Sequence, residues 1–195
     1  MISSKEKIVE SAQDLFHRNG FQNTSIDSIL ESTGVTKSNL YYHFKSKEEL
    51  GLLVLEKRIT EYEREFFTNT FEDKGLTPEQ RLTRYYKKVI THYKTLDYRF
   101  GCPFGNLAQE LSDANEKFRL MLSYFFDRWQ KAIEGCIKEG MKQKQFRDDI
   151  SSKDISLLIL SHLEGAILMS KTHRSGQPLN SGSRSILKLI RRDTK

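Results

Sequence analysis

Apolar residues recur along almost the whole chain at the spacing of helices that bury one face. Residues 8–16 form the first such run, and the Asn-Gly pair at 19–20 ends it. Shorter runs cover residues 26–30 and 36–43, with Gly34 between them. No stretch of useful length alternates apolar and polar residues as a strand does. The pattern predicts an all-α protein that begins with three closely spaced short helices.

Polar residues at the starts of these runs fit helix caps. Thr24 and Asp27 are placed to cap the second helix, and Thr36 is placed to cap the third. Ser46 and Glu49 have the spacing of a capping box that opens a long fourth helix. Further helices are predicted over residues 77–93, 104–111, 118–140, 152–171 and 186–190, with a loop over residues 175–183.

The composition is that of an ordinary globular protein, with 195 residues of which 37% are hydrophobic and 30% are charged. It excludes collagen-like, low-complexity and largely disordered classes. No apolar run approaches the roughly 18 residues of a transmembrane helix, and the charged, helical pattern of residues 1–20 leads us to expect no secretory leader. We therefore expect a cytoplasmic protein that does not contact a membrane.

Two cysteines, Cys102 and Cys136, stand apart from any cysteine or histidine cluster, so neither a metal site nor a disulfide is expected. Common catalytic and nucleotide-binding motifs, such as G-x-S-x-G, H-E-x-x-H and the P-loop, are absent. His92 and His162 could pair with a nucleophilic Cys102, but nothing in the sequence brings them to it. An enzyme is therefore disfavoured, and no cofactor is predicted.

The net charge of +6 lies in the C-terminal tail, because residues 171–195 carry +6 whereas residues 1–50 carry −1. We expect most of the tail charge to be solvated. A protein that binds DNA without sequence preference would need a more basic N-terminal half. Residues 32–47, however, contain no acidic residue, and such a local patch is enough for a small DNA-reading domain.

Three short helices joined by tight turns are the arrangement of a helix-turn-helix motif. In this motif one helix enters the major groove of DNA while its underside packs in the core. The helix over residues 36–44 fits, since Leu40 and Phe44 share one face. Lysine can bind guanine and asparagine can bind adenine in the groove. The side chains placed to read bases are Lys37, Ser38 and Asn39.

Residues 24–30 (TSIDSIL) and 34–50 (GVTKSNLYYHFKSKEEL) resemble the DNA-binding domain of TetR-family repressors in residue types, spacing and turns. The resemblance implies a helix-turn-helix domain over residues 1–46. It also implies a larger helical domain for ligand binding and dimerisation over residues 47–195. Such proteins are homodimers that bind a palindromic double-stranded DNA operator, and a small effector lowers their affinity for DNA.

By position, the resemblance assigns Lys37, Ser38 and Asn39 to base edges. The residues that it assigns to phosphates are Thr24, Ser25, Tyr41, Tyr42, His43 and Lys47. The two tyrosines could instead pack partly in the core. His43 could be a surface residue without a partner, and we expect Lys45 to be solvated.

Most aromatic residues lie in the C-terminal part, where they could line a cavity between helices. The candidate pocket residues are Tyr62, Phe66, Tyr86, Tyr93, Cys102, Phe118, Phe125, Trp129 and His162. Any one of them could equally be ordinary core. No charged pair stands out as a ligand clamp, so the sequence does not indicate the chemistry of the effector.

Cys102 directly precedes Pro103, a residue favoured in the first turn of a helix. A thiol at a helix N-terminus ionises readily and can be reactive at neutral pH. Residues 101–112 resemble a TetR subgroup with Gly-Cys at this point, which implies a switch that senses electrophiles or oxidants through Cys102 and Lys171. The Pro-Phe pair after the cysteine departs from that subgroup. The alternative is that Cys102, like Cys136, fills the core.

Residues 152–172 and 184–192 are expected to serve dimerisation, and a broad apolar stripe along the first of these ranges suits a two-fold interface with a second copy of the chain. Its residues are Ile155, Leu158, Ile159, His162, Leu163, Ala166 and Met169. We therefore expect a homodimeric, ligand-responsive repressor in which the fourth helix carries a change to the DNA-binding domain. A thiol switch at Cys102 is the alternative.

Overall fold

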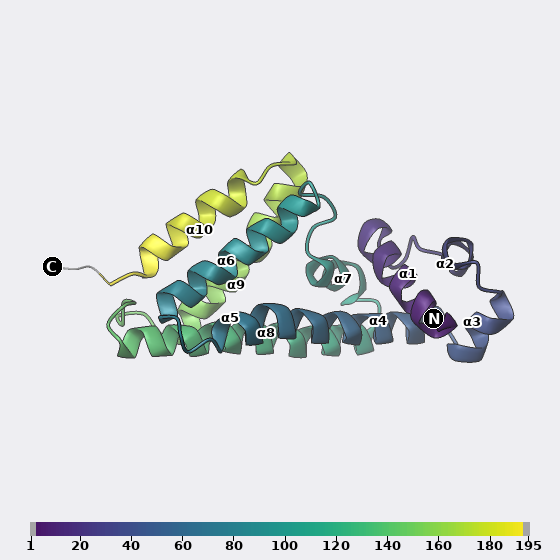
Figure 1. The fold of residues 1–195 in the computed structure, drawn as a ribbon, viewed down its shortest axis with the longest axis horizontal. Coiled ribbons are helices and arrows are strands. Elements are labelled where there is room, and N and C mark those ends of the chain that lie inside the picture. The colour runs from purple at the N-terminus through teal and green to yellow at the C-terminus, as the bar shows by residue number, and fades with distance from the viewer. Residues whose placement is uncertain (1–2, 193–195) are drawn as a thin grey trace. The chain divides into compact units, whose positions relative to one another are not determined.

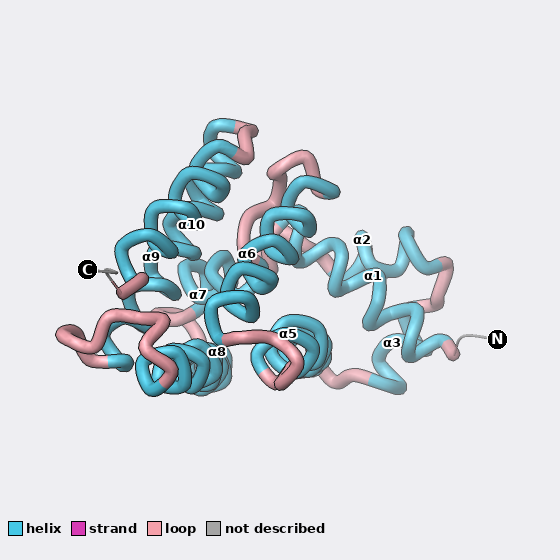
Figure 2. Tube along the Cα trace, turned by 60° about the vertical axis from the view of Figure 1, so that its left-hand side comes forward, coloured by secondary structure: helices cyan, strands magenta, loops and turns pink. Residues whose placement is uncertain are grey.

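The computed structural model describes residues 3–192, and helices account for most of them (Figures 1 and 2). Within that range, the one β-type pairing is an isolated antiparallel bridge between Phe146 and Arg191. The all-α prediction is therefore confirmed. The elements are α1 (Ser4–Asn19), α2 (Ile26–Thr33), α3 (Lys37–His43), α4 (Lys47–Tyr62), the π-helix η1 (Glu63–Thr68), α5 (Asn69–Phe71), α6 (Pro78–Thr95), α7 (Pro103–Leu111), α8 (Glu116–Lys142), α9 (Ser152–His173) and α10 (Gln177–Ile190).

The chain folds into two compact units. The first unit comprises the described residues up to Glu61 together with Pro103–Leu122, and the second comprises Tyr62–Cys102 with the described residues from Ser123 onwards. The expected division at residues 46/47 follows the end of the helix-turn-helix motif. The packing differs from it, because most of α4, all of α7 and the start of α8 join the first unit.

In the first unit, one apolar face of each of α1, α2 and α3 builds the core, as the helical spacing predicts. Gly20, with a φ of 88°, ends α1, and Gly34, in the left-handed conformation, ends α2. Residues with a side chain are strained in such conformations, so glycine permits both tight turns. The side chains at the centre of this core are Ile8, Ala12, Ile29, Leu40 and Leu50.

The cap of α3 is Thr36, as predicted. The cap of α2 is Ser25, whose hydroxyl oxygen accepts a hydrogen bond from the amide of Ser28 at 3.0 Å. The prediction of Thr24 as that cap is therefore wrong. Thr24 is buried, and its hydroxyl donates to the carbonyl of Gly20 at 2.7 Å, which ties the turn to the end of α1.

In the second unit, α9 and α10 lie side by side, and α10 also contacts α6 (Figures 1 and 2). By length and composition alone, α9 is apolar enough to cross a membrane, but 44% of its most apolar window is buried inside the protein. Ile155, Ile159 and Leu163 form the buried face of this helix. Core packing thus accounts for a large part of its apolar character.

α10 begins at Gln177, so the predicted loop over residues 175–183 is wrong. Pro178 occupies the first turn of the helix, where the missing amide breaks no hydrogen bond. A side chain at Gly182 would overlap the ring of His162 on α9. The small residue that suggested a loop instead allows two helices to approach closely.

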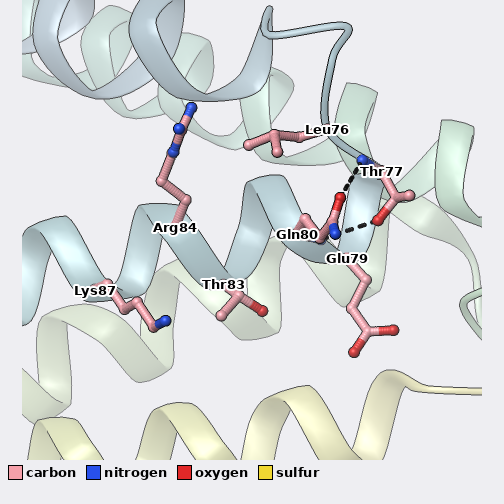
Figure 3. A pocket seen from close by; sticks show the side chains of 7 residues that line it. All are labelled: Leu76, Thr77, Glu79, Gln80, Thr83, Arg84 and Lys87. Atoms are coloured by element: carbon pink, nitrogen blue, oxygen red, sulfur yellow. Dashed lines mark hydrogen bonds between the residues drawn. The ribbon is translucent and has the colours of Figure 1, made fainter.

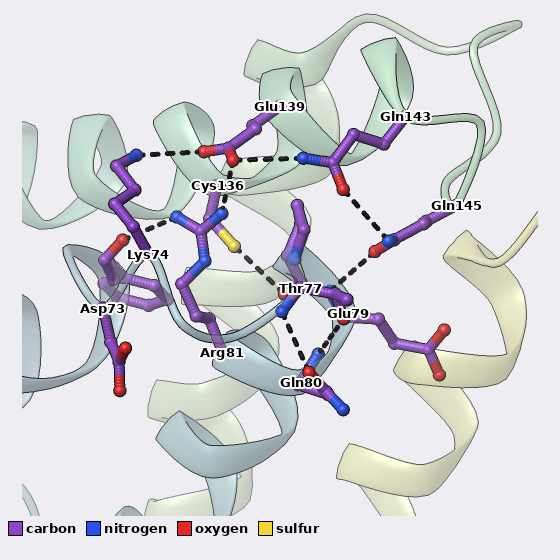
Figure 4. A network of polar contacts seen from close by, with 12 residues as sticks. Asp73, Lys74, Thr77, Glu79, Gln80, Arg81, Cys136, Glu139, Gln143 and Gln145 are labelled. Carbon is purple, nitrogen blue, oxygen red and sulfur yellow. Dashed lines mark hydrogen bonds and ion pairs between the residues drawn. The ribbon is translucent and has the colours of Figure 1, made fainter.

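A buried guanidinium joins the start of α6 to α8 (Figure 4). Arg81 is 1% exposed, and it pairs with Glu139 at 2.7 Å and donates to the carbonyl of Phe71 at 2.8 Å. The hydrogen bond from Arg81 lowers the pKa of Glu139. Nearby, the thiol of Cys136 donates to the carbonyl of Pro78 at 3.2 Å. Removing one partner would leave a buried charge, so this network stabilises the fold.

Replacement of Gly51 in α4 tests the packing of the first unit. A Cβ at Gly51 would lie 2.5 Å from the ring of Phe21 and 2.9 Å from the ring of Phe118. We expect Gly51→Ala to lower the free energy of unfolding by about 1–3 kcal/mol in urea denaturation, because the rings must move. Gly135→Ala is the control, since nothing lies within 4 Å of its added Cβ. Equal effects of the two substitutions would contradict the close packing at Gly51.

Candidate DNA interface and effector site

α3 is anchored on one side and open on the other. Leu40 and the adjoining Phe44 are buried in the first unit. Tyr42 is 84% exposed and Tyr41 is 46% exposed, so neither packs fully in the core. His43 is partly buried, and its ring meets the ring of Tyr42 edge-on at 5.0 Å. This end of the helix therefore offers phenolic hydroxyls and an imidazole to a partner.

The N-terminal turn of α3 carries the residues predicted to read bases. Lys37 and Ser38 are exposed, and Lys37 is only 3.5 Å from Asp27 in an exposed ion pair. Asn39 is partly buried, and its side-chain oxygen has no hydrogen-bond partner although solvent does not reach it. Exposed ion pairs are weak and easily exchanged. Lys37 and Ser38 are thus accessible for contacts in a DNA groove, whereas the side-chain oxygen of Asn39 is covered in this conformation.

Two of the residues predicted to hold phosphates are engaged inside the first unit. Lys47 is partly buried, and its ammonium group donates to the carbonyls of Phe21 at 2.8 Å and Thr24 at 2.9 Å. Thr24 itself is buried. Ser25 is exposed but caps α2. These residues therefore shape the turn before α2.

The same turn is held from a second direction by α7. The carboxylate of Glu110 accepts hydrogen bonds from the amides of Phe21 at 2.9 Å and Gln22 at 2.5 Å. Burial lowers the pKa of Lys47, and the nearby charge of Glu110 opposes that shift. The ammonium group of Lys47 thus binds the carbonyls of this turn, and the carboxylate of Glu110 binds its amides. This contact lies within the first compact unit, which includes Pro103–Leu122.

Four of the predicted pocket residues form one aromatic cluster in the second unit. The ring of Tyr62 stacks on Phe66 at 4.3 Å and also meets Trp129 at 4.8 Å and Phe125 at 5.9 Å. The π-helix that follows Tyr62 turns Phe66 inward. The hydroxyl of Tyr62 lies 3.2 Å from that of Tyr85, which accepts a hydrogen bond from the Trp129 indole at 2.8 Å.

Other predicted pocket residues lie elsewhere. Phe118 belongs to the first unit, where its ring packs 5.2 Å from that of Phe21. His162 lies against Gly182 of α10, and its Nδ1 is buried without a partner. Tyr86 is buried in α6, and its hydroxyl also has no partner.

Cys102 lies at the centre of a second set of polar contacts. Side-chain hydrogen bonds connect it to Tyr93 and to Glu164. Burial raises the pKa of Glu164 to about 7, and the hydrogen bond from Cys102 acts against that rise. Burial also raises the pKa of Tyr93 well above its ordinary value. Tyr93 is therefore a neutral hydroxyl at physiological pH, whereas Glu164 can be neutral or ionised.

The remaining candidates for thiol chemistry differ in position. Cys102 is buried and directly precedes α7, as predicted. Lys171 is partly buried, two helical turns beyond Glu164 on the same side of α9. Burial raises the pKa of Cys136 to about 12, so that thiol is unreactive at neutral pH.

A surface depression follows the exposed side of α6 (Figure 3). It is lined by Leu76, Thr77, Glu79, Gln80, Thr83, Arg84 and Lys87. Its polar groups already serve the fold, because Arg84 pairs with Asp73 at 2.6 Å and Thr77 forms a capping box with Gln80. Within residues 3–192, no group of three or more His, Cys, Asp and Glu side chains could hold a metal ion.

The predicted dimer stripe divides between two sides of α9. The residues that pack inside the chain are Ile155, Ile159, Leu163 and Ala166. Leu158 and Met169 are each 49% exposed, and Leu157 and Leu168 are similarly exposed beside them. A Cβ at Gly165 would have nothing within 4 Å. Packing within one chain thus explains the first group, and the second group forms an open apolar face.

Two acidic residues were missed by the sequence analysis. Glu164 lies four residues after Leu160 and three before Ile167, both buried, so its spacing alone signals an inward position. Glu110 lies at the end of a short helix and far along the chain from its partners. No local signal could have identified it.

Residues 8–52 match the protein-family model described as "Bacterial regulatory proteins, tetR family". Residues 78–186 match the model described as "Tetracyclin repressor-like, C-terminal domain". The chain belongs to the TetR family. It is therefore a DNA-binding, ligand-responsive transcriptional regulator, as the resemblance implied. Membership of this family of regulators also agrees with the expectation that the protein is not an enzyme.

TetR-family relatives span nearly the whole chain. The HTH-type transcriptional repressor DhaR of Mycobacterium sp. strain GP1 is 31% identical over 176 residues, covering 90% of this chain and 86% of that protein. The HTH-type transcriptional repressor NemR of Escherichia coli is 20% identical, covering 96% of this chain and 94% of that protein.

Solved structures share the fold. A TetR regulatory protein from Rhodobacter sphaeroides superposes with a TM-score of 0.88 at 24% identity, covering 94% of this chain and 97% of that one. The reduced form of E. coli NemR superposes with a TM-score of 0.85 at 20% identity, covering 96% of this chain and 97% of that one.

Proposed function

We propose that this protein is a cytoplasmic repressor that binds a palindromic operator as a homodimer and is released by a small effector. The observation that carries the proposal is the first turn of α3, where Lys37, Ser38 and Asn39 stand on a helix anchored by buried Leu40. Lysine and asparagine recognise guanine and adenine edges in the major groove. Tyr41, Tyr42 and His43 would then position the helix on phosphates. The relative DhaR is named a transcriptional repressor, which supports repression over activation for this protein.

The dimer of this proposal forms through the open face of α9. Leu157, Leu158, Leu168 and Met169 are apolar side chains exposed along that face. Gly165 lies between them and would let a partner helix approach closely. A two-fold axis through this face would cover the same patch on both copies and pair two α3 helices with two operator half-sites.

The conformational change that releases the operator would be transmitted through α7. The chain leaves the second unit at Cys102, and α7 begins with the next residue. Glu110, near the other end of α7, holds the turn before α2. A ligand that changes the surroundings of Cys102 would therefore act on that turn, alongside the predicted route through α4. Coupling free energies of about 1–3 kcal/mol are typical of such linked sites.

Replacement of the groove-facing residues tests the DNA interface. We expect Lys37→Ala and Asn39→Ala each to weaken binding to the DNA upstream of the protein's own gene by about 1–3 kcal/mol, because each removes a base contact. Fluorescence anisotropy at fixed salt, against unrelated DNA, measures the effect. Lys131→Ala, an exposed lysine of α8, is the control and should bind as the wild type does. Equal binding of all four proteins to both DNAs would contradict the proposal.

Charged substitutions on α9 test the dimer. We expect Leu158→Glu combined with Leu168→Glu to shift the protein to a monomer in sedimentation velocity, because paired carboxylates would face each other across the axis. Leu120→Glu is the control, since Leu120 is equally exposed but lies in the first unit. A double variant that sediments as the wild type does would rule out this face.

A thiol switch is the second candidate, and the contacts of Cys102 favour it over a purely structural cysteine. The hydrogen bond to Glu164 provides an acceptor for the thiol proton, which would leave a nucleophilic thiolate. An electrophilic alkene such as a maleimide would then form a C–S bond to the sulfur, its C=C π bond would break, and the proton accepted by Glu164 would pass to the neighbouring carbon. A reducing agent would not reverse such an adduct, whereas it would reverse a disulfide or sulfenic acid.

The Cys102→Ser variant separates the two candidates. If the thiol is the sensor, N-ethylmaleimide should abolish specific DNA binding by the wild type and by Cys136→Ser, but not by Cys102→Ser. Anisotropy with operator DNA measures the loss. A full response of Cys102→Ser to the reagent would exclude the thiol switch and leave a noncovalent effector.

A further inference from the structure

Polar groups from several helices converge inside the second unit, in surroundings that are otherwise aromatic and aliphatic. They are Tyr62 at the end of α4, Tyr85 and Tyr93 of α6, Cys102, Trp129 of α8 and Glu164 of α9. Apart from Glu164, these groups are neutral at physiological pH when the thiol keeps its proton. Sites that bind small molecules typically have mostly apolar walls and a small number of polar groups that point to one place.

Hydrogen bonds within the set satisfy the neutral groups. The Trp129 indole donates to Tyr85, whose hydroxyl meets that of Tyr62. Tyr93 and Glu164 both bond to Cys102. One oxygen of the set remains without a hydrogen bond: Oε1 of Glu164 is shielded from solvent and has no partner. Buried polar oxygens nearly always have a donor, so this atom calls for an explanation.

The surroundings of Glu164 indicate which kind of group would satisfy this oxygen. Among the described residues, no lysine or arginine acts on the carboxyl of Glu164, and the titratable groups that face it are Cys102, Tyr93 and Tyr85. A buried carboxylate is stabilised best by a cation that also donates hydrogen bonds. The faces of tyrosine and tryptophan rings attract cations as well.

We propose that Glu164 anchors an effector that is an organic cation, with a protonated amine on Oε1 and an apolar body against the rings of Tyr62 and Trp129. The inference rests on the proposed ligand-responsive function and names the class of its effector. A neutral ligand would leave the carboxylate without a countercharge, and an anionic ligand would be repelled by it. The surroundings of Glu164 thus favour cations over isosteric neutral molecules.

The fluorescence of Trp129 tests the proposal directly, because it is the single tryptophan of the chain. The full-length protein is titrated at pH 8 with benzylamine and 2-phenylethylamine, which are protonated at that pH. The neutral probes of matching shape are benzyl alcohol and 2-phenylethanol. We expect a saturable change with at least one amine, and a dissociation constant at least about tenfold lower than that of the matching alcohol, as for other charge-assisted hydrogen bonds.

Two variants assign the preference to one carboxyl group. Glu164→Gln keeps the size of the side chain and should reduce the difference between amine and alcohol to less than about twofold, since the charge is gone. Glu72→Gln removes an exposed carboxylate from the same unit and should behave as the wild type does. Both measurements use the same fluorescence titration.

A folding control accompanies Glu164→Gln. The carboxyl has a higher pKa in the folded protein than in the unfolded chain, so ionisation destabilises the fold as the pH rises from about 4.5 towards 7. The variant should therefore melt at the same temperature as the wild type or higher at pH 8, and the difference should shrink at pH 5. A variant that folds normally keeps the titration interpretable.

Three results would overturn the assignment: no saturable change with either amine, equal affinity for amine and alcohol, or an unchanged preference in Glu164→Gln. Anisotropy with operator DNA is measured in parallel. Specific DNA binding without amine binding would reject the cation site and leave the repressor proposal intact. Amine binding through Glu164 without specific DNA binding would instead support the site and count against the repressor.

Discussion

The turn between α1 and α2 depends on two opposite charges that act on its backbone. Lys47 donates to its carbonyls, and Glu110 accepts from its amides. Charge-assisted hydrogen bonds are stronger than neutral ones, and here they are partly shielded from water. Because α2 begins directly after this turn, the two side chains fix how the helix-turn-helix motif joins α4 and α7. The same contact joins α7 to the turn before α2 within the first unit.

The interior of the second unit combines a closely packed, hydrogen-bonded part with one buried oxygen that has no partner. Arg81 and Glu139 tie α6 to α8, and the rings around Tyr62 pack edge-on and face-on. Glu164 stands in contrast, since its buried oxygen has no partner. A group that weakens the fold in the absence of a ligand is stabilised when the ligand arrives, which is how binding free energy couples to conformation. In the proposed effector site, ligand binding would therefore act through this one side chain.

α9 shows how one helix can serve two surfaces. Its inner side belongs to the core of a single chain, and its outer side keeps leucine and methionine exposed. A helix that is apolar around most of its circumference is either buried on all sides or covered by a partner. The same composition explains why α9 alone resembles a membrane span, although 44% of its most apolar window is buried within the protein.

The sequence by itself determined the helical class, most helix ends, the helix-turn-helix motif and the residues of α3 that face outward. These features follow from local spacing, caps and glycine turns, for which the physical cause lies within a few residues. The position of α10 was mispredicted because Gly182 looks like a loop signal until His162 is placed beside it. Tertiary structure alone decided that Lys47 and Glu110 hold one turn, that Phe118 belongs to the first unit, and that Glu164 meets Cys102. Each of these contacts joins residues that are far apart in the sequence. Burial, charge pairing and hydrogen bonding depend on their distance in the folded chain, which local sequence patterns do not reveal.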